Sequence, residues 1–269
     1  MATGNPALNE KYFQQEASTG ERTSVMTVQG AAIKTMVLTA ILVAAAAVSW
    51  GIVFPHGISS PSGMTTAAGK VIPPEVNHTA MVGFLAGGSI VALILGLIMC
   101  FRPKAAPVCA PLYAVSEGLA LGAISGVYAV GAYPGIVMQA GMLTIGVLVS
   151  MLTLYATRLI VVTDKLRTGI MAATMGIMLV YLASMVLRMF NVGIPYIHDG
   201  GMIGIGFSIV VVIIAALNLV LDFDTIEAGA HFRAPKYMEW YSAYGLLVTL
   251  VWLYLEILRL LAKLQSNRD

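Results

Sequence analysis

Apolar and polar stretches alternate along the chain, and the apolar ones have the length of membrane crossings. Seven apolar runs of about 20 residues are separated by short segments that carry most of the charged residues. A helix of that length crosses the hydrocarbon core of a bilayer with all of its backbone hydrogen bonds satisfied. The pattern therefore predicts an all-α, polytopic membrane bundle with seven transmembrane helices, over residues 32–54, 79–101, 109–131, 134–157, 168–190, 201–222 and 241–261.

The two ends of the chain are polar. Residues 1–30 lack the basic start, the short apolar stretch and the small-residue cleavage site of a secretory signal. We therefore predict a disordered cytoplasmic tail over residues 1–30, a transmembrane domain over residues 31–264 and a short tail over residues 265–269. The segment 223–240, between the last two runs, is amphipathic and charged.

The distribution of basic residues indicates the orientation of the helices, because cytoplasmic loops carry an excess of Lys and Arg. With the N-terminus inside, the outer segments before the last run hold only Lys70 and Arg188. A seventh crossing would place Arg259, Lys263 and Arg268 outside, and a re-entrant seventh segment would remove that conflict. We predict seven crossings, since residues 241–261 are long enough to span. The inner basic residues are Arg22, Lys34, Arg102, Lys104, Arg158, Lys165, Arg167, Arg233 and Lys236.

Composition agrees with a membrane protein and excludes several other classes. Only 10% of the 269 residues are charged and 58% are hydrophobic, whereas about a quarter of a soluble domain is charged. The net charge of +2 provides no basic surface for nucleic acid. Cys100 and Cys109 flank a predicted cytoplasmic turn, where thiols stay reduced. Four histidines without an HExxH motif do not support a zinc site.

Glycines spaced four residues apart predict close helix contacts, because small residues let helix backbones approach each other in lipid. Three such sets are expected to be packing seams. They are Gly118, Gly122 and Gly126 in the third run, Gly83 and Gly87 in the second, and Gly200 and Gly204 at the start of the sixth.

Ionisable groups inside a membrane are costly, and each is therefore a functional candidate. Asp222 ends the sixth run, and Asn218 lies one turn earlier on the same face. Asp224 and Glu227 point elsewhere and are expected to reach the headgroup region. Glu117 lies about 12 Å into the third helix, where its neutral form can hydrogen-bond a neighbouring backbone.

Glu256, in the seventh run, has two readings. It can form an intrahelical ion pair with Arg259, three residues later. It also shares a helix face with Thr249, seven residues earlier, and both can face the same neighbour.

The sequence favours neither of two classes of intramembrane protease. Ser125 lies between small residues, as in an intramembrane serine protease, but such a serine needs a base within reach. All four histidines fall in predicted loops. An aspartic protease would need two aspartates deep in separate helices, whereas Asp222 and Asp224 are close in sequence and near a surface.

Two segments in the last third carry a family pattern: residues 219–226, which read LVLDFDTI, and residues 254–261, which read YLEILRLL. They resemble the Bax inhibitor-1-like family, also called the transmembrane Bax inhibitor motif family. Residues 116–118 and 122–125 of the third run fit the same pattern. Residues 5–13 and 234–241 resemble a bacterial branch, which implies a multi-pass protein of the plasma (inner) membrane with a cytoplasmic N-terminus.

The resemblance implies a seven-helix fold with the last helix near the centre. Some members are pH-sensitive calcium leak channels, in which an aspartate ending helix six pairs with one in helix seven. Asp222 matches the first position, and Thr249, which cannot ionise, stands at the second. Glu256 lies two turns further on the same face. The expected ion-binding or pH-sensing residues are Asp222, Asn218, Thr249, Glu256 and Glu117, with Asp222 as the metal ligand.

Three functions remain open. The first is a pH-gated cation leak with calcium as the transported ion and no cofactor. The second is a non-channel regulator that binds a membrane protein partner, such as a membrane-bound ATP-dependent protease, through its N-terminal tail. The third is a proton-coupled transporter. In each case the lipid bilayer is the surrounding partner.

Overall fold

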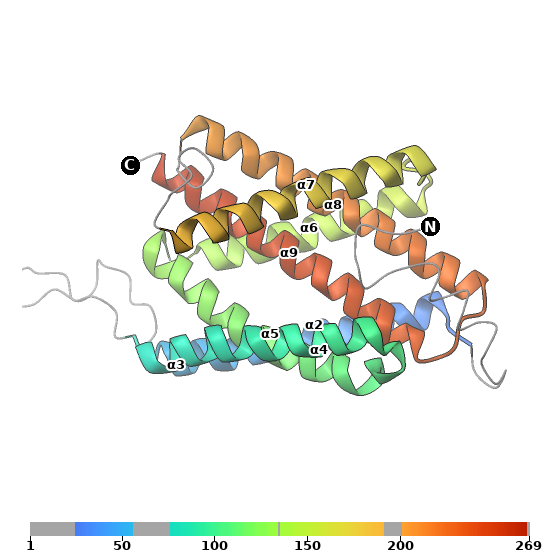
Figure 1. Cartoon of the computed structure of the whole chain (residues 1–269), viewed down its shortest axis with the longest axis horizontal. Coiled ribbons are helices and arrows are strands. Elements are labelled where there is room, and N and C mark those ends of the chain that lie inside the picture. The colour runs from blue at the N-terminus through green and yellow to red at the C-terminus, as the bar shows by residue number, and fades with distance from the viewer. Residues whose placement is uncertain (1–24, 56–75, 134, 191–200, 268–269) are drawn as a thin grey trace, which may run out of the picture.

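The computed structural model describes residues 25–55, 76–133, 135–190 and 201–267. This part of the chain contains seven helical segments long and apolar enough to cross a membrane, which confirms the predicted all-α bundle (Figure 1). Their elements are α2 (Val28–Val53), α3 (His78–Val82) with the π-helix η1 (Gly83–Gly88) and α4 (Ser89–Phe101), the 3₁₀ turn η2 (Pro103–Ala105) with α5 (Ala106–Gly131), α6 (Ile136–Ala156), α7 (Asp164–Met189), α8 (Met202–His231) and α9 (Met238–Ser266).

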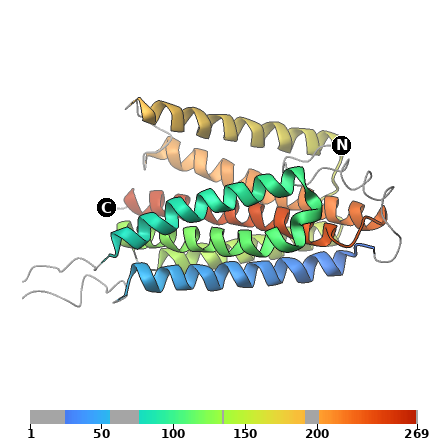
Figure 2. The ribbon, with the colours of Figure 1, turned by 60° about the horizontal axis from the view of Figure 1, so that its bottom comes forward.

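The last helix, α9, lies at the centre of the bundle. It packs against α2, α5, α6 and α8, whereas α4 lies outside on α5 and α7 lies outside on α8. Figure 2 shows this order, with α7 outermost beyond α8. In the most apolar stretch of α9, 56% of the residues are buried, compared with 17% in α6. The predicted central position of the last helix is therefore confirmed.

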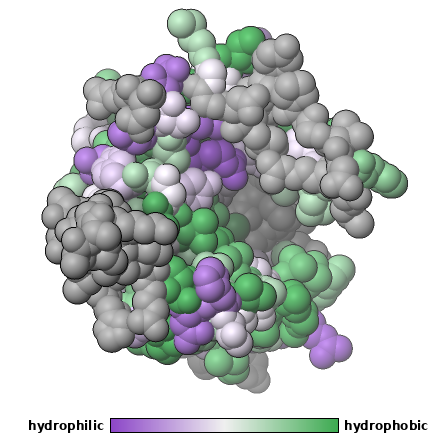
Figure 3. Space-filling view, turned by 90° about the vertical axis from the view of Figure 1, so that its left-hand side faces the viewer, coloured by the Kyte–Doolittle hydropathy of each residue, from purple (hydrophilic) through white to green (hydrophobic). Residues whose placement is uncertain are grey.

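The helices run back and forth between two ends of the bundle. The N-terminal end holds the start of α2, the α4–α5 turn, the α6–α7 loop and the α8–α9 turn, and the C-terminal end holds the start of α8 and the end of α9. Figure 3 looks onto the C-terminal end, where hydrophilic side chains gather beside hydrophobic surface. At that end Lys263 of α9 contacts Gly204 at the start of α8. Hence α9 runs the whole length of the bundle.

Helix α8 continues nine residues past Asp222, where the predicted crossing ended. Asp224 forms an ion pair with Arg167 of α7, and Glu227 accepts hydrogen bonds from Tyr155 and from Arg158, the latter at 2.7 Å. The hydrogen bond to Glu227 raises the pKa of the Arg158 guanidinium. Both acids therefore have partners at this end of the bundle, and the Glu227–Arg158 pair is largely exposed. That these acids reach the headgroup region stays a prediction. Partners on neighbouring helices satisfy them, and so the helix can extend beyond the apolar run.

The packed part of the chain also begins earlier than residue 31. Val25 forms an isolated antiparallel bridge with Pro235, and the Met26 N–H donates to the Ala234 carbonyl at 2.7 Å. Thr27 caps α2 by accepting a hydrogen bond from the Gly30 N–H. We call residues 25–27 the strap. Residues 1–24 of the predicted tail lie outside the described residues.

The glycine face of α5 packs against α2, as predicted. A Cβ atom built on Gly118 would lie 2.8 Å from the Ala45 Cβ, and one built on Gly122 would lie 3.0 Å from the Ala46 Cα. A Cβ on Gly126 would overlap the ring of Phe54. Contact between the two backbones at this interface therefore requires glycine.

The predicted seam at Gly83 and Gly87 is wrong, because a Cβ atom at either position would meet nothing within 4 Å. The close positions are Gly88 and Gly96 instead: a Cβ built on Gly88 would lie 2.7 Å from the Ser116 carbonyl oxygen, and one built on Gly96 would lie 2.8 Å from the Tyr244 hydroxyl. Adjacent helix positions point about 100° apart, so four-residue spacing alone could not choose between the two sets. Gly200 lies outside the described residues.

Candidate ion-binding and pH-sensing site

Two of the predicted polar residues are buried one turn apart on α8. Asp222 has 0% exposure and Asn218 has 3%. The Asn218 amide donates to the Thr174 hydroxyl of α7 and to the Ile214 carbonyl, each at 2.8 Å. Asn218 is therefore held in place by two helices. Asp222 is a wholly enclosed carboxyl group on α8, the helix that packs along the central helix α9.

Thr249 is buried on α9 and donates to the Gly245 carbonyl of the preceding turn. Such a side-chain bond within the helix is an ordinary way to satisfy a threonine hydroxyl in a membrane. The hydroxyl oxygen remains a possible acceptor. The α8–α9 pair thus carries one carboxyl group, Asp222, one amide, Asn218, and one threonine hydroxyl, Thr249, as buried polar groups.

Glu256 is held by partners of its own. Arg259 donates to both carboxylate oxygens at 2.8 and 2.9 Å, and the Tyr181 hydroxyl of α7 lies 2.9 and 3.0 Å from the same oxygens. The guanidinium also lies over the Tyr181 ring, 5.0 Å from its centroid. The intrahelical pair with Arg259, one of the two readings from sequence, is present.

The partners on α7 show how far apart the two acidic groups lie. Asn218, beside Asp222, bonds Thr174, whereas Glu256 bonds Tyr181. Seven residues on one helix correspond to about 10 Å along its axis. Glu256 therefore lies at a different level of the bundle from Asn218, and its carboxylate accepts hydrogen bonds from Arg259 and Tyr181.

Glu117 lies elsewhere again, half-buried on α5. It interacts electrostatically with Tyr113 and with Tyr244 of α9, whose rings meet edge-on at 4.8 Å. No hydrogen bond joins Glu117 to another residue in the described part of the chain, so the expected bond to a neighbouring backbone is not found there. Of the five candidate residues, Asp222 and Asn218 therefore lie together on α8, Thr249 is buried on α9, and Glu256 and Glu117 each have separate surroundings.

The chemistry of the Asp222 region suits transient binding of a hard cation. Calcium prefers six to eight oxygen ligands. Asp222, Asn218 and threonine hydroxyls supply oxygen, but too few for a tight site. Within the described residues, no group of three or more His, Cys, Asp or Glu side chains is placed to hold a metal ion.

Two buried charged residues were not recognised from sequence as parts of a site. Glu239 has 0% exposure and accepts from the Thr27 N–H and hydroxyl at 3.0 and 3.1 Å, and it forms ion pairs with Lys34 and Lys236. Lys263, at the other end of α9, is 6% exposed. The sequence offered one signal for Glu239, its three-residue spacing from Lys236, and none that distinguished Lys263 from a basic topology residue.

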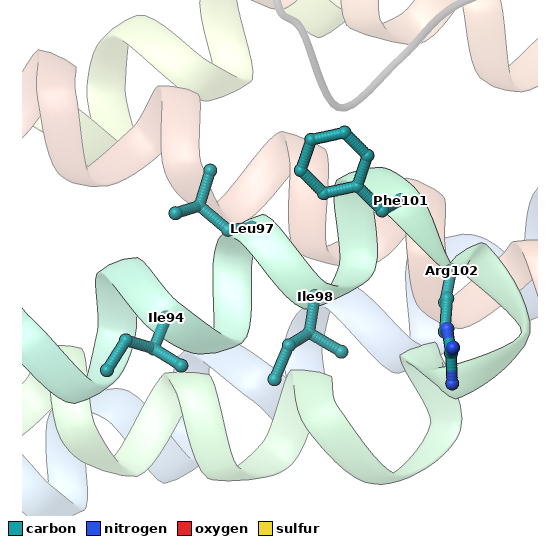
Figure 4. Close-up of a pocket in the computed structure, with 5 residues that line it drawn as sticks. All are labelled: Ile94, Leu97, Ile98, Phe101 and Arg102. Atoms are coloured by element: carbon teal, nitrogen blue, oxygen red, sulfur yellow. The ribbon is translucent and has the colours of Figure 1, made fainter.

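Other features have structural explanations. Cys100 and Cys109 are free thiols. Ser125, for which the sequence indicates no base of the kind that a nucleophile needs, shares a 2.8 Å hydrogen bond with the Tyr254 hydroxyl. A hollow on α4 is lined by Ile94, Leu97, Ile98, Phe101 and Arg102 (Figure 4). Its apolar side chains have the chemistry expected of a surface that faces lipid.

Comparison with known proteins supports the pattern read from the sequence. No curated protein matches the chain. A family profile described as Bax inhibitor 1 like matches residues 5–266. The match includes all seven helices and both of the segments in α8 and α9 that carry the resemblance. The chain therefore belongs to the Bax inhibitor 1 like family.

Proposed function

We propose that the protein is a pH-sensitive cation leak, with calcium as the cation and without enzymatic activity. The observation that supports this most is the full burial of the Asp222 carboxyl group within the membrane-spanning part of α8. A carboxyl group removed from water favours its neutral form, and a nearby cation favours its charged form. Asp222 is thus a group whose charge can respond both to pH and to a passing cation.

The position of Asp222 connects that charge to the rest of the bundle. It lies on α8, which packs along α9, and α9 in turn contacts α2, α5 and α6. A change in charge at a buried interface alters the favoured packing of the two helices. The few oxygen ligands nearby suit permeation, which requires a cation to bind weakly enough to leave. Because Thr249 cannot ionise, the proposed switch has one carboxyl group at these two positions.

The first test is cation flux with Asp222→Asn. Purified protein in liposomes that contain a calcium indicator is assayed at several pH values. We expect the wild type to show a pH-dependent leak and Asp222→Asn to leak at a rate that no longer depends on pH. The amide keeps the shape of the side chain and a carbonyl acceptor but does not take up or release a proton in this range.

Asp224→Asn is the matched control. It removes the same charge two residues away, from a group paired with Arg167. It should therefore retain the pH dependence. Thr249→Asp, which adds a second acid, should broaden the pH response, since two close carboxyl groups lose their protons in two steps. A pH profile that is unchanged in Asp222→Asn would contradict the proposed role of Asp222.

We further propose that the chain lies in a bacterial plasma membrane with its N-terminal end in the cytoplasm. The basic residues at the described N-terminal end, among them Arg102, Arg158 and Lys165, support this orientation. A reporter that is active only in the cytoplasm should be inactive when fused after Asp269 and active when fused before Met1. Cytoplasmic activity of the Asp269 fusion would contradict a seventh crossing.

One observation favours regulation of a partner as a second candidate function. The strap ties the N-terminal segment to the α8–α9 turn, and Glu239 joins Thr27 to the first turn of α9. A partner that pulls on the tail, such as a membrane-bound ATP-dependent protease, would therefore act on the central helix. Removal of residues 1–24 separates the two functions. A leak should survive the deletion, whereas binding to a purified protease of this class should be lost.

A further inference from the structure

One face of α8 is buried along almost the whole length of the helix. Its buried residues recur every three or four positions, which places them on one stripe. Ser208 and Asp222 are fourteen positions apart, which is about 21 Å along the helix axis. The members of the stripe are Gly204, Ser208, Val211, Ala215, Asn218 and Asp222. Lys263 of α9 contacts Gly204 and Ser208 at one end of this stripe. The Asn218 amide, in the same stripe, bonds Thr174 of α7. Since α8 packs along α9, we call the stripe and the part of α9 beside it the α8–α9 seam.

Lys263 lies at the end of the seam opposite Asp222. Its ammonium group donates to the Gly204 carbonyl at 3.0 Å and to the Ser208 hydroxyl at 2.9 Å. A lysine near a helix end in a membrane normally extends its charged group toward water. Lys263 is instead 6% exposed and turns inward onto α8. The C-terminal end of α9, where the helix dipole favours a cation, partly offsets the cost of this burial.

The acceptors of Lys263 are the kinds of oxygen that coordinate a permeating metal cation. Backbone carbonyl and side-chain hydroxyl oxygens replace the water around such an ion. The ammonium group of Lys263 therefore occupies a position that an incoming cation would otherwise use, and it repels that cation electrostatically. A divalent ion is repelled twice as strongly as a monovalent one at the same distance.

From this geometry we propose that Lys263 is a tethered cation that closes the C-terminal end of the α8–α9 seam to permeating cations. The proposal rests on the proposed leak, and it identifies where a cation enters the bundle and what limits its entry. The seam then carries a carboxyl group at one end and an ammonium group at the other. Asp222 would respond to pH, and Lys263 would set the barrier to cations.

The flux test uses Lys263→Met, which keeps most of the length of the side chain but removes the charge. We expect calcium flux into liposomes to rise on the order of tenfold, because the variant removes one positive charge close to the proposed cation path. Lys263→Arg keeps a positive donor and should leak as slowly as the wild type. Lys165→Met, which removes an exposed lysine at the N-terminal end, is the matched control and should have no effect.

Cysteine labelling tests the same closure without measuring flux. Ala215 is buried midway along the seam. In a background with Cys100→Ser and Cys109→Ser, Ala215→Cys should resist a cationic methanethiosulfonate reagent while Lys263 is present. It should react at least about ten times faster when combined with Lys263→Met, because the same charge barrier is removed. If the Met variant does not fold, Lys263→Gln replaces it in both experiments, because glutamine keeps an N–H donor but carries no charge.

The outcomes separate the two proposals. A pH-dependent leak that is unchanged by Lys263→Met overturns the closure and leaves the leak intact. Absence of flux in every variant overturns the leak, and the labelling then decides the closure alone. Equal protection of Ala215→Cys with and without Lys263 overturns the closure. Faster labelling and faster flux in the Met variant, together with wild-type behaviour of Lys263→Arg, support it.

Discussion

Replacing Glu239 by alanine is expected to lower the free energy of unfolding by about 3–5 kcal/mol, the usual effect of removing one partner of a buried ion pair. The carboxylate is fully buried and accepts from both the N–H and the hydroxyl of Thr27. It also pairs with Lys34, whose side chain is only 16% exposed. Without Glu239, the Lys34 ammonium loses this ion pair in a mostly buried position, and the strap loses its connection to α9. The measurement is the midpoint of thermal unfolding in detergent.

Glu227→Ala is the matched control for this change. Glu227 is also an acid in an ion pair, with Arg158, but the two side chains are 44% and 62% exposed. Exposed pairs contribute at most about 1 kcal/mol. A second variant, Gly30→Ala, disturbs the same cluster by changing α2 instead of α9, since a Cβ on Gly30 would overlap the Glu239 carboxylate. Equal, small shifts in Glu239→Ala and Glu227→Ala would show that the cluster does not stabilise the bundle.

Replacing Gly122 by leucine is expected to prevent α5 from packing on α2. A Cβ at this position would lie 3.0 Å from both the carbonyl carbon and the Cα of Ala46, and closer still to its carbonyl oxygen. Overpacking costs about 1–3 kcal/mol where side chains can move aside, and more where they cannot. The obstacle here is the backbone of α2, which cannot rotate away. We therefore expect a large fall in the yield of folded protein and in its thermal midpoint.

Gly146→Leu is the control for the leucine substitution. Gly146 lies within α6, and a Cβ there would meet nothing within 4 Å. Leucine has a higher helix propensity than glycine, so this variant should be at least as stable as the wild type. Wild-type stability of Gly122→Leu would mean that α2 and α5 can separate without cost, contrary to the close packing of the two helices.

Individual residues show why the fold was easier to predict than the candidate site. The seven helices follow from the length of the apolar runs. The full enclosure of Asp222 does not follow from sequence, which placed this acid at the end of a run and near a surface. Glu256 had two readings from sequence, and only the position of Tyr181 on α7 showed where its carboxylate is held. Sequence spacing describes neighbours on one helix, whereas both Glu256 and Asn218 depend on a second helix.

The sequence by itself determined the number of helices long and apolar enough to cross a membrane and their order along the chain. Hydropathy over about 20 residues is a property of a single segment, and lipid, as the surrounding solvent, selects for it regardless of the neighbouring helices. The positions of the basic residues between the runs likewise predict an orientation before any helix packs.

The tertiary structure alone decided which face of each helix is buried. A transmembrane helix is apolar on every side, so hydropathy does not distinguish its lipid face from its packed face. Three features each depend on a second segment that is distant in sequence. They are the close packing at Gly88 but not at Gly83, the burial of Glu239 beside the strap, and the inward orientation of Lys263. These contacts depend on which helices become neighbours, and that information appears only when the bundle has formed.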